Sequence, residues 1–147
     1  EIMPSLVGSE MCIRDRHIRE HSPGSFHIIY QKEEIFSMFQ IETISAKMLD
    51  YYVERSDAVI IDLRDSAAYR RGHVRNAVNI PYRELEEYLE KKQDQKYRFP
   101  KDKLLIFYCD RGGASMQAAR SLARQGCRTR SVIGGFAAYR GRNLVRG

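Results

Sequence analysis

The sequence predicts an α/β domain in which helices flank a parallel β-sheet. Two short segments, the β-branched Ala58–Leu63 and the apolar Leu104–Cys109, do not alternate between apolar and polar residues, which is typical of strands buried on both faces. Segments with apolar residues at helical spacing lie between such runs. Because buried strands that alternate with helices are joined by crossovers, this order favours a parallel sheet wrapped by helices.

The strands are expected where short apolar runs end at polar residues, glycine or proline. The run before Cys109 and the β-branched run AVIIDL are the clearest of them, and Pro81 ends another. Five strands are expected, over Ile41–Ile44, Ala58–Leu63, Ala77–Ile80, Leu104–Tyr108 and Arg128–Ile133.

The helices are expected from capping residues and apolar spacing. Ser45 is a suitable N-cap for a first helix, in which Ala46, Leu49 and Val53 recur at helical spacing. Glycines end two of the later helices, and Asp94–Lys103 is expected to be a polar loop. Those later helices are expected over Ser66–Arg71, Arg83–Lys92, Ser115–Gln125 and Phe136–Arg140.

The chain has 147 residues and a formal net charge of +6, and the charge is unevenly distributed. No acidic residue follows Asp110, whereas eight arginines do. A surface of one sign attracts anions, but the stretch lacks the basic groove interleaved with aromatics that is typical of nucleic-acid binding. We therefore expect a small anionic substrate and no nucleic-acid partner.

The apolar runs and the cysteines indicate the compartment. The longest runs are too short to cross a bilayer, so no membrane association is expected. Three irregularly spaced cysteines do not form a disulfide framework, which favours a reducing compartment, the cytoplasm. No metal site is expected either, because Cys109 and Cys127 lie far apart and no Cys or His pair has ligand spacing.

The segment Ser5–Arg16, SLVGSEMCIRDR, resembles the in-frame translation of a transposon-end adapter used in sequencing libraries. The match covers ten consecutive residues, so no function is assigned to Cys12. We expect residues 1–37 to be an artefactual or disordered extension, and residues 38–147 to form the domain, with Met38 as the natural start.

Cys109 is the candidate nucleophile because it stands where a buried strand gives way to a glycine-containing loop and then a helix. Ligands of parallel sheets bind beyond the carboxyl ends of the strands. Gly112 and Gly113 let the loop curl, so that its N–H groups and the helix N-terminus stabilise a thiolate or an oxyanion. The alternative is that Cys109 is a small buried apolar residue. Cys127 lacks such a loop and is interpreted as an apolar residue, although a resolving role is left open.

Two parts of the chain resemble the single-domain rhodanese family of sulfurtransferases. The first is IIDLRDSAAYRRGHVRNAVNIP, Ile60–Pro81, which is similar to the family's Asp-x-Arg, Gly-His and Ala-x-Asn-Ile-Pro segment. The second is FYCDRGGASMQAARSLARQG, Phe107–Gly126, with VIGGFAAYRG downstream, similar to the active-site loop, its helix and a Gly-Gly turn.

The resemblance implies a three-layer domain with a central five-stranded parallel sheet flanked by helices. It implies that Cys109 takes sulfane sulfur from a small anionic donor such as thiosulfate, forms a persulfide and passes the sulfur to a thiol or cyanide, without a cofactor. A protein of a sulfur relay is a further partner. Asp62, Arg64 and His73 match family positions and are expected to be hydrogen-bonded braces between loops. The substrate loop that the resemblance implies consists of Asp110, Arg111, Gly112, Gly113, Ala114 and Ser115.

Ala114 departs from the family pattern, since many active relatives carry Arg or Thr there. Either Arg111 supplies the missing charge or the natural donor is not thiosulfate. Phosphatases and arsenate reductases of related fold need Arg six residues after the cysteine, to clamp an oxyanion with two hydrogen bonds, and here that residue is Ser115. A non-catalytic, regulatory rhodanese-like module is the other alternative, but such modules usually lose the cysteine that this chain keeps.

Overall fold

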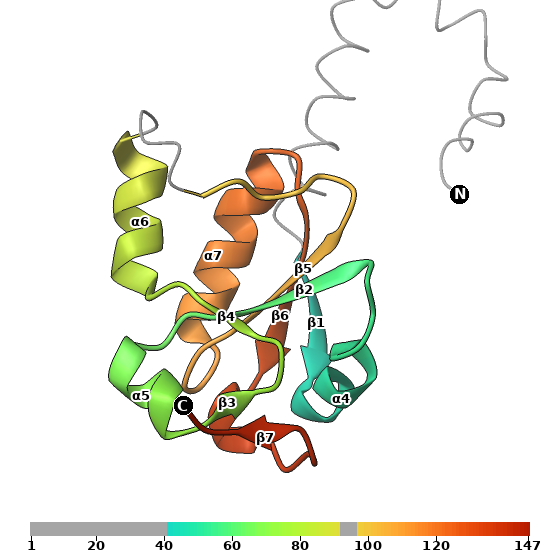
Figure 1. The fold of residues 1–147 in the computed structure, drawn as a ribbon. Helices are drawn as coiled ribbons and strands as arrows, with labels where there is room; N and C mark the ends of the chain where they lie inside the picture. The colour runs from blue at the N-terminus through green and yellow to red at the C-terminus, as the bar shows by residue number, and fades with distance from the viewer. Residues whose placement is uncertain (1–40, 92–96) are drawn as a thin grey trace, which may run out of the picture. The chain divides into compact units, whose positions relative to one another are not determined.

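The computed structural model describes residues 41–91 and 97–147, which all belong to one compact unit, Met38–Gly147 (Figure 1). Its centre is a five-stranded parallel sheet with the strand order β1-β6-β5-β2-β4. All five residues of β5 are buried, as expected for the middle strand. The strands are β1 (Glu42–Ser45), β2 (Ala58–Asp62), β4 (Val78–Asn79), β5 (Leu104–Tyr108) and β6 (Arg128–Ile133).

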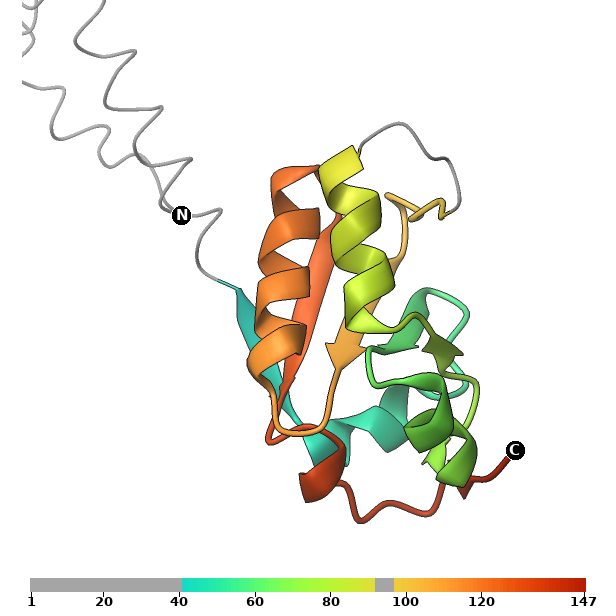
Figure 2. The same ribbon diagram turned by 90° about the vertical axis from the view of Figure 1, so that its left-hand side faces the viewer.

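Helices cover both faces of the sheet, which gives the expected three layers. On one face α6 (Tyr82–Lys91) and α7 (Gly113–Arg124) lie side by side (Figure 2). Their apolar residues, among them Leu85 and Leu122, pack on Leu105 and Phe107 of β5. On the other face η1 (Ala46–Met48) and α4 (Leu49–Tyr52) pack on the alternate side chains of β5. The fold class and its five-stranded parallel sheet are therefore confirmed.

A second, two-stranded sheet lies outside the main one and was not predicted. It consists of β3 (His73–Val74) and β7 (Leu144–Val145), which pair antiparallel. Strands of two residues are too short to leave a periodic pattern, so the sequence gives no sign of them. The pairing ties the end of the chain to the residues that follow α5 (Ser66–Arg71).

Several predicted elements are confirmed and others need correction. The bounds of α5, β5 and β6 agree with the prediction. Ser45 makes no side-chain capping bond, and the first helix begins as a 3-10 turn instead. The helix predicted over Phe136–Arg140 is a shorter 3-10 turn, η2 (Phe136–Ala138). The expected loop Asp94–Lys103 is polar only in part, because its Tyr97 and Phe99 pack on the aromatic ring of Tyr88.

The expectations for residues 1–37 lie outside the described residues. Among the helices of residues 41–91 and 97–147, none combines the length and apolar character needed to cross a membrane.

Asp50 of α4 fastens the segment after η2 to the domain. Its carboxylate accepts hydrogen bonds from the Tyr139 hydroxyl at 2.6 Å, the Asn143 side-chain amide at 2.7 Å and the Arg142 backbone N–H at 3.3 Å. Burial disfavours the charged form of Asp50, but these bonds outweigh it and lower the pKa of the carboxyl below its ordinary value of 3.8. Burial and the same carboxylate raise the pKa of Tyr139 to about 12.

Asp50→Asn is expected to destabilise the protein at pH 7 by about 1–2 kcal/mol, because the amide accepts weaker hydrogen bonds than the carboxylate. A lowered folded-state pKa contributes stability above the unfolded-state pKa, and this stability is lost as pH falls through the folded-state value. The gap in melting temperature between the variant and the parent should therefore be full at pH 7 and shrink below about pH 4. Asp102→Asn, at an exposed loop position, is the control. A gap that stayed constant with pH would contradict this account of Asp50.

Candidate active site

Cys109 follows the last residue of β5, at the carboxyl end of the parallel sheet. The side chain is 7% exposed, while Asp110 and Arg111 beside it are exposed. The backbone N–H of Gly112 donates a hydrogen bond to the Cys109 sulfur at 3.0 Å. A thiolate is the reactive form of cysteine, and a directed N–H group stabilises its charge. The sequence predicted several N–H groups of the loop and helix around the sulfur, and in the described structure one of them, that of Gly112, donates to it.

Gly112 and Gly135 give this loop its shape. Gly112 has a φ of 115°, a left-handed conformation that side chains rarely adopt and from which α7 begins. Gly135 has a φ of 59°, and a Cβ atom there would lie 2.6 Å from the Asp110 carbonyl oxygen and closer still to that of Cys109. The absent side chain lets the Gly134–Gly135 turn lie directly against the loop.

The turn holds the loop through two backbone hydrogen bonds. The Phe136 N–H donates to the Cys109 carbonyl at 2.8 Å, and the Ala137 N–H donates to the Asp110 carbonyl at 3.0 Å. Both donors lie in the first turn of η2, where backbone N–H groups lack helical partners. The carbonyl of the nucleophile and that of the residue after it are thereby fixed.

Ser115 belongs to the same loop, but its hydroxyl is buried rather than open to substrate. It donates to the Gly112 carbonyl at 3.0 Å and pairs with the Ser131 hydroxyl of β6 at 2.8 Å. The Cys109 thiol reaches the Ser115 oxygen at 3.7 Å. Ser131 was missed by the sequence reasoning. The sequence signal that could have found Ser131 is a serine beside the apolar Val132 in a predicted strand, and the structure buries both residues.

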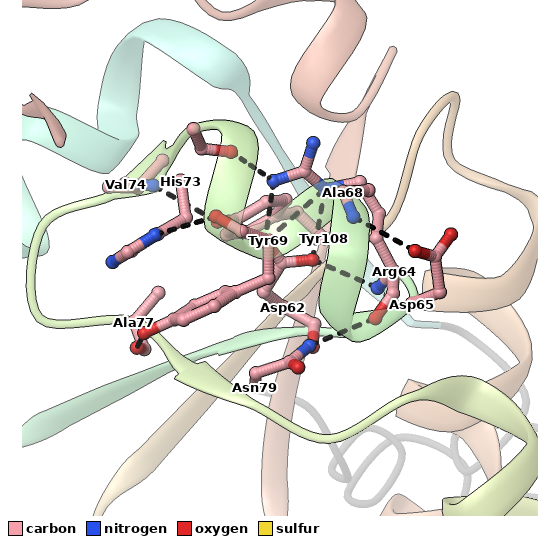
Figure 3. Close-up of polar contacts among 11 residues, drawn as sticks. Asp62, Arg64, Asp65, Ala68, Tyr69, His73, Val74, Ala77, Asn79 and Tyr108 are labelled. Carbon is pink, nitrogen blue, oxygen red and sulfur yellow. Dashed lines mark hydrogen bonds and ion pairs between the residues drawn. The ribbon is translucent and has the colours of Figure 1, made fainter. Parts of the chain in front are cut away.

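Asp62, which ends β2 level with Tyr108 of β5, forms a buried ion pair with Arg64 (Figure 3). The Arg64 guanidinium donates to the Asp62 carboxylate at 2.7 Å and to the Gly72 carbonyl at 2.6 Å. It also lies 3.8 Å from the centre of the Phe136 ring, whose backbone N–H holds Cys109. Burial disfavours the charge on Arg64, but Asp62 outweighs this and raises the pKa of Arg64. The expected brace is present, and it reaches the nucleophile through Phe136.

His73 also braces the fold, through contacts with Tyr69. Its Nδ1 atom lies 2.9 Å from the Tyr69 carbonyl oxygen, and its ring stacks on the Tyr69 ring at 3.6 Å (Figure 3). The Tyr69 hydroxyl in turn donates to the Ala77 carbonyl at 2.8 Å. His73 thus joins α5 to β3 and is not brought to the sulfur.

Arg111 and Ala114 have different surroundings. Arg111 is exposed, and among the described residues it forms no ion pair. Ala114 is partly buried, and its methyl group packs on the apolar cluster under α6 and α7. The loop therefore offers one guanidinium near Cys109, at the position expected from the sequence.

Cys127 lies at the other end of the sheet, which excludes the resolving role left open by the sequence. The register pairs Leu104 of β5 with Arg128 of β6, so Cys127 lies level with the start of β5. Six residues of strand separate that level from Cys109, about 20 Å. A disulfide needs Cα atoms within about 7 Å. Burial raises the pKa of the Cys127 thiol, with Lys101 opposing it in part, so this thiol is less reactive at neutral pH.

Within residues 41–91 and 97–147 there is no group of three or more His, Cys, Asp or Glu side chains that could hold a metal ion.

Comparisons with known proteins find relatives of this chain. Residues 45–142 match the model of the rhodanese-like domain family. The thiosulfate sulfurtransferase GlpE of Coxiella burnetii is 35% identical over 89 residues, which are 60% of this chain and 77% of that protein. A tRNA sulfurtransferase of Desulfurococcus amylolyticus is 25% identical over 126 residues, 86% of this chain but 23% of that protein. The crystal structure of a rhodanese-like domain protein from Staphylococcus aureus superposes with a TM-score of 0.59 at 22% identity, covering 73% of this chain and 99% of that one, and supports the fold.

Gly135→Ala is expected to destabilise the protein by at least about 2 kcal/mol and to reduce reactivity at Cys109, because the new methyl group pushes η2 off the loop. Gly113→Ala is the matched control, since a Cβ atom there meets no atom within 4 Å and its φ is not positive. Urea denaturation and the alkylation rate of Cys109, read by peptide mass, check both. Equal stabilities and rates for the two variants would contradict the role given to Gly135.

Proposed function

The chain belongs to the rhodanese-like domain family and is a sulfurtransferase, and we propose that it carries sulfane sulfur as a persulfide on Cys109 and passes it to a thiol or cyanide. The observation that carries this proposal is the Cys109 sulfur, held at the carboxyl end of β5 within hydrogen-bonding distance of the Gly112 N–H. Backbone bonds from η2 fix the carbonyls of the nucleophile and of Asp110 after it.

The first half-reaction loads the sulfur. The Cys109 thiolate attacks the outer sulfur of the donor and forms a new S–S bond. The bond between that outer sulfur and the rest of the donor, also an S–S bond, breaks. With thiosulfate, the bonding electron pair leaves on sulfite, and the charge of −3 on the reactants is retained as a persulfide anion and a sulfite dianion. A persulfide donor reacts in the same way and leaves as a thiolate. Neither step needs a cofactor.

The second half-reaction releases the sulfur. An acceptor thiolate or cyanide attacks the outer sulfur of the Cys109 persulfide, and the electron pair of the broken bond returns to Cys109 as a thiolate. The Gly112 N–H that binds the sulfur stabilises this leaving group. No histidine or carboxylate side chain of the described residues touches the sulfur, so the stabilising charge comes from backbone dipoles and from the exposed Arg111.

The buried position of Ser115 supports sulfur transfer over phosphate chemistry. A phosphatase loop would place a guanidinium there to clamp the oxyanion, whereas this chain buries a hydroxyl that bonds to Gly112 and Ser131. We also place the protein in the cytoplasm, because a catalytic thiol has to stay reduced between turnovers.

Cys109→Ser is expected to abolish sulfur transfer, because a hydroxyl does not ionise at neutral pH and forms no stable sulfane-sulfur adduct. Intact-mass measurement after incubation with thiosulfate, and separately with glutathione persulfide, should show one added sulfur atom on the peptide that contains Cys109. Cys127→Ser, which removes a remote and less reactive thiol, should load as the parent does. Sulfur loading that survived in Cys109→Ser and vanished in Cys127→Ser would show that Cys127, and not Cys109, is the nucleophile.

Ala114→Arg is expected to lower the Michaelis constant for thiosulfate several-fold. The added guanidinium would face the dianion, while its methylene stem covers the apolar cluster on which the alanine packs. The gain should shrink at high salt, because the loop is open to solvent. Ala114→Met, of similar length and without charge, controls for crowding. An equal or higher constant in the Arg variant than in the Met variant would mean that Arg111 already supplies the needed charge.

A further inference from the structure

Three separate segments at the end of the fold that carries Cys109 hold exposed arginines. We call these six the arginine rim: Arg70, Arg71, Arg111, Arg140, Arg142 and Arg146. All six are exposed. Both ribbon views show α5, η2 and the loop between β5 and α7 gathered at this end (Figures 1 and 2).

Hydrogen bonds make the rim continuous with the active-site loop. The Arg140 guanidinium donates to the Ala137 carbonyl at 2.8 Å, and the N–H of the same Ala137 holds Asp110. At the other side, Arg146 donates to the Arg71 carbonyl at 3.2 Å, and the Gly147 N–H donates to the Arg70 carbonyl at 3.0 Å. The rim therefore extends from the loop, along the C-terminal segment, to the end of α5.

Most of the rim has no acidic neighbour among the described residues, although Asp50 interacts electrostatically with Arg142 and Asp65 with Arg71. In residues 41–91 and 97–147, the ion pairs involve Arg55, Arg64, Arg75, Arg130 and Lys91, and no member of the rim. Asp65, at the start of α5, is engaged as the helix N-cap with the Ala68 N–H. A small dianion at Cys109 cannot contact guanidiniums spread from the loop to α5. The rim is thus suited to a larger anionic surface.

The side chains between the arginines fit a protein better than a nucleic acid. Leu144 of β7, which lies between Arg142 and Arg146 in the sequence, is 47% exposed. Ile133, just before the Gly134–Gly135 turn, is 59% exposed. Apolar side chains beside arginines are typical of protein interfaces. Binding of single-stranded nucleic acid calls for exposed aromatic rings, but Tyr139 of this segment is buried and the Phe136 ring is covered by Arg64.

We propose that the arginine rim docks an acidic protein that presents a cysteine thiol to the Cys109 persulfide. The proposal rests on the proposed sulfur transfer. The partner's thiolate attacks the outer sulfur of the persulfide, the S–S bond to Cys109 breaks, and the electron pair returns to Cys109, so the partner leaves as the persulfide. The rim contributes by orienting the partner and raising its local concentration, both of which depend on ionic strength.

The test compares two synthetic hexapeptide acceptors, EECGEE and its neutral counterpart QQCGQQ. The full chain is first loaded with sulfur, excess donor is removed, and loss of sulfur from Cys109 is followed by mass spectrometry. The rim variant carries Arg70→Gln, Arg142→Gln and Arg146→Gln, and leaves Arg111 of the loop intact. A charge-matched control carries Arg83→Gln, Arg120→Gln and Arg128→Gln, which are exposed positions of α6, α7 and the start of β6.

At low salt the rim variant is expected to transfer sulfur to EECGEE about tenfold more slowly than the parent and the control variant do. QQCGQQ and the small neutral thiol 2-mercaptoethanol should react at the same rate with all three proteins, and high salt should remove the difference. Melting temperatures of the variants confirm that they are folded.

Equal EECGEE rates for the rim variant and the parent, with transfer to 2-mercaptoethanol intact, would overturn the docking proposal alone. Absence of any transfer to 2-mercaptoethanol by the parent would overturn the proposed function as well. A rim variant that lost binding to poly(U) RNA while it transferred sulfur to EECGEE at the parent rate would identify a nucleic-acid surface instead.

Discussion

The hydrogen bond from the Phe136 N–H to the Cys109 carbonyl is the contact on which the rest of the site depends. It fixes the backbone at the nucleophile, and it exists only because Gly135 has no side chain. Once Cys109 and Asp110 are held, the chain has to turn within a few residues to enter α7, and Gly112 makes that turn in a left-handed conformation. The Gly112 N–H then points at the sulfur. The charge-stabilising group is therefore a product of backbone geometry.

The buried Asp62–Arg64 pair secures the other side of that contact. Taking two charges out of water costs several kcal/mol, so such a pair is weak evidence for stability in itself. Here the guanidinium donates hydrogen bonds to the Asp62 carboxylate and the Gly72 carbonyl, and it packs on the face of the Phe136 ring. Loss of either partner would leave a buried charge unpaired beside the ring that positions Cys109. The pair defines one arrangement of β2, α5 and η2.

Sequence reasoning could predict what local pattern encodes. The continuous apolar run Leu104–Tyr108 and the glycine after Arg71 fixed the bounds of β5 and α5, and the strand end followed by glycines pointed to Cys109. It could not predict what depends on contacts between distant residues. The Ser115–Ser131 hydroxyl pair joins positions 16 residues apart, and the approach of Gly135 to Cys109 appears only when the strands are aligned. The same alignment separates Cys127 from Cys109 by the length of the sheet.

In a site that stabilises sulfur with backbone groups, the groups that support the reaction differ from those that choose the donor or the acceptor. The Gly112 N–H binds the sulfur whatever the donor or acceptor is, because it recognises charge and not the rest of the molecule. Discrimination between donors then has to come from the side chains around the loop. In this chain they include Asp110 and Arg111, which are exposed and of opposite charge, and Ala114, which adds no charge. With so little recognition at the loop itself, the proposed arginine rim, which hydrogen bonds through Ala137 join to the loop, is the surface that would add selectivity.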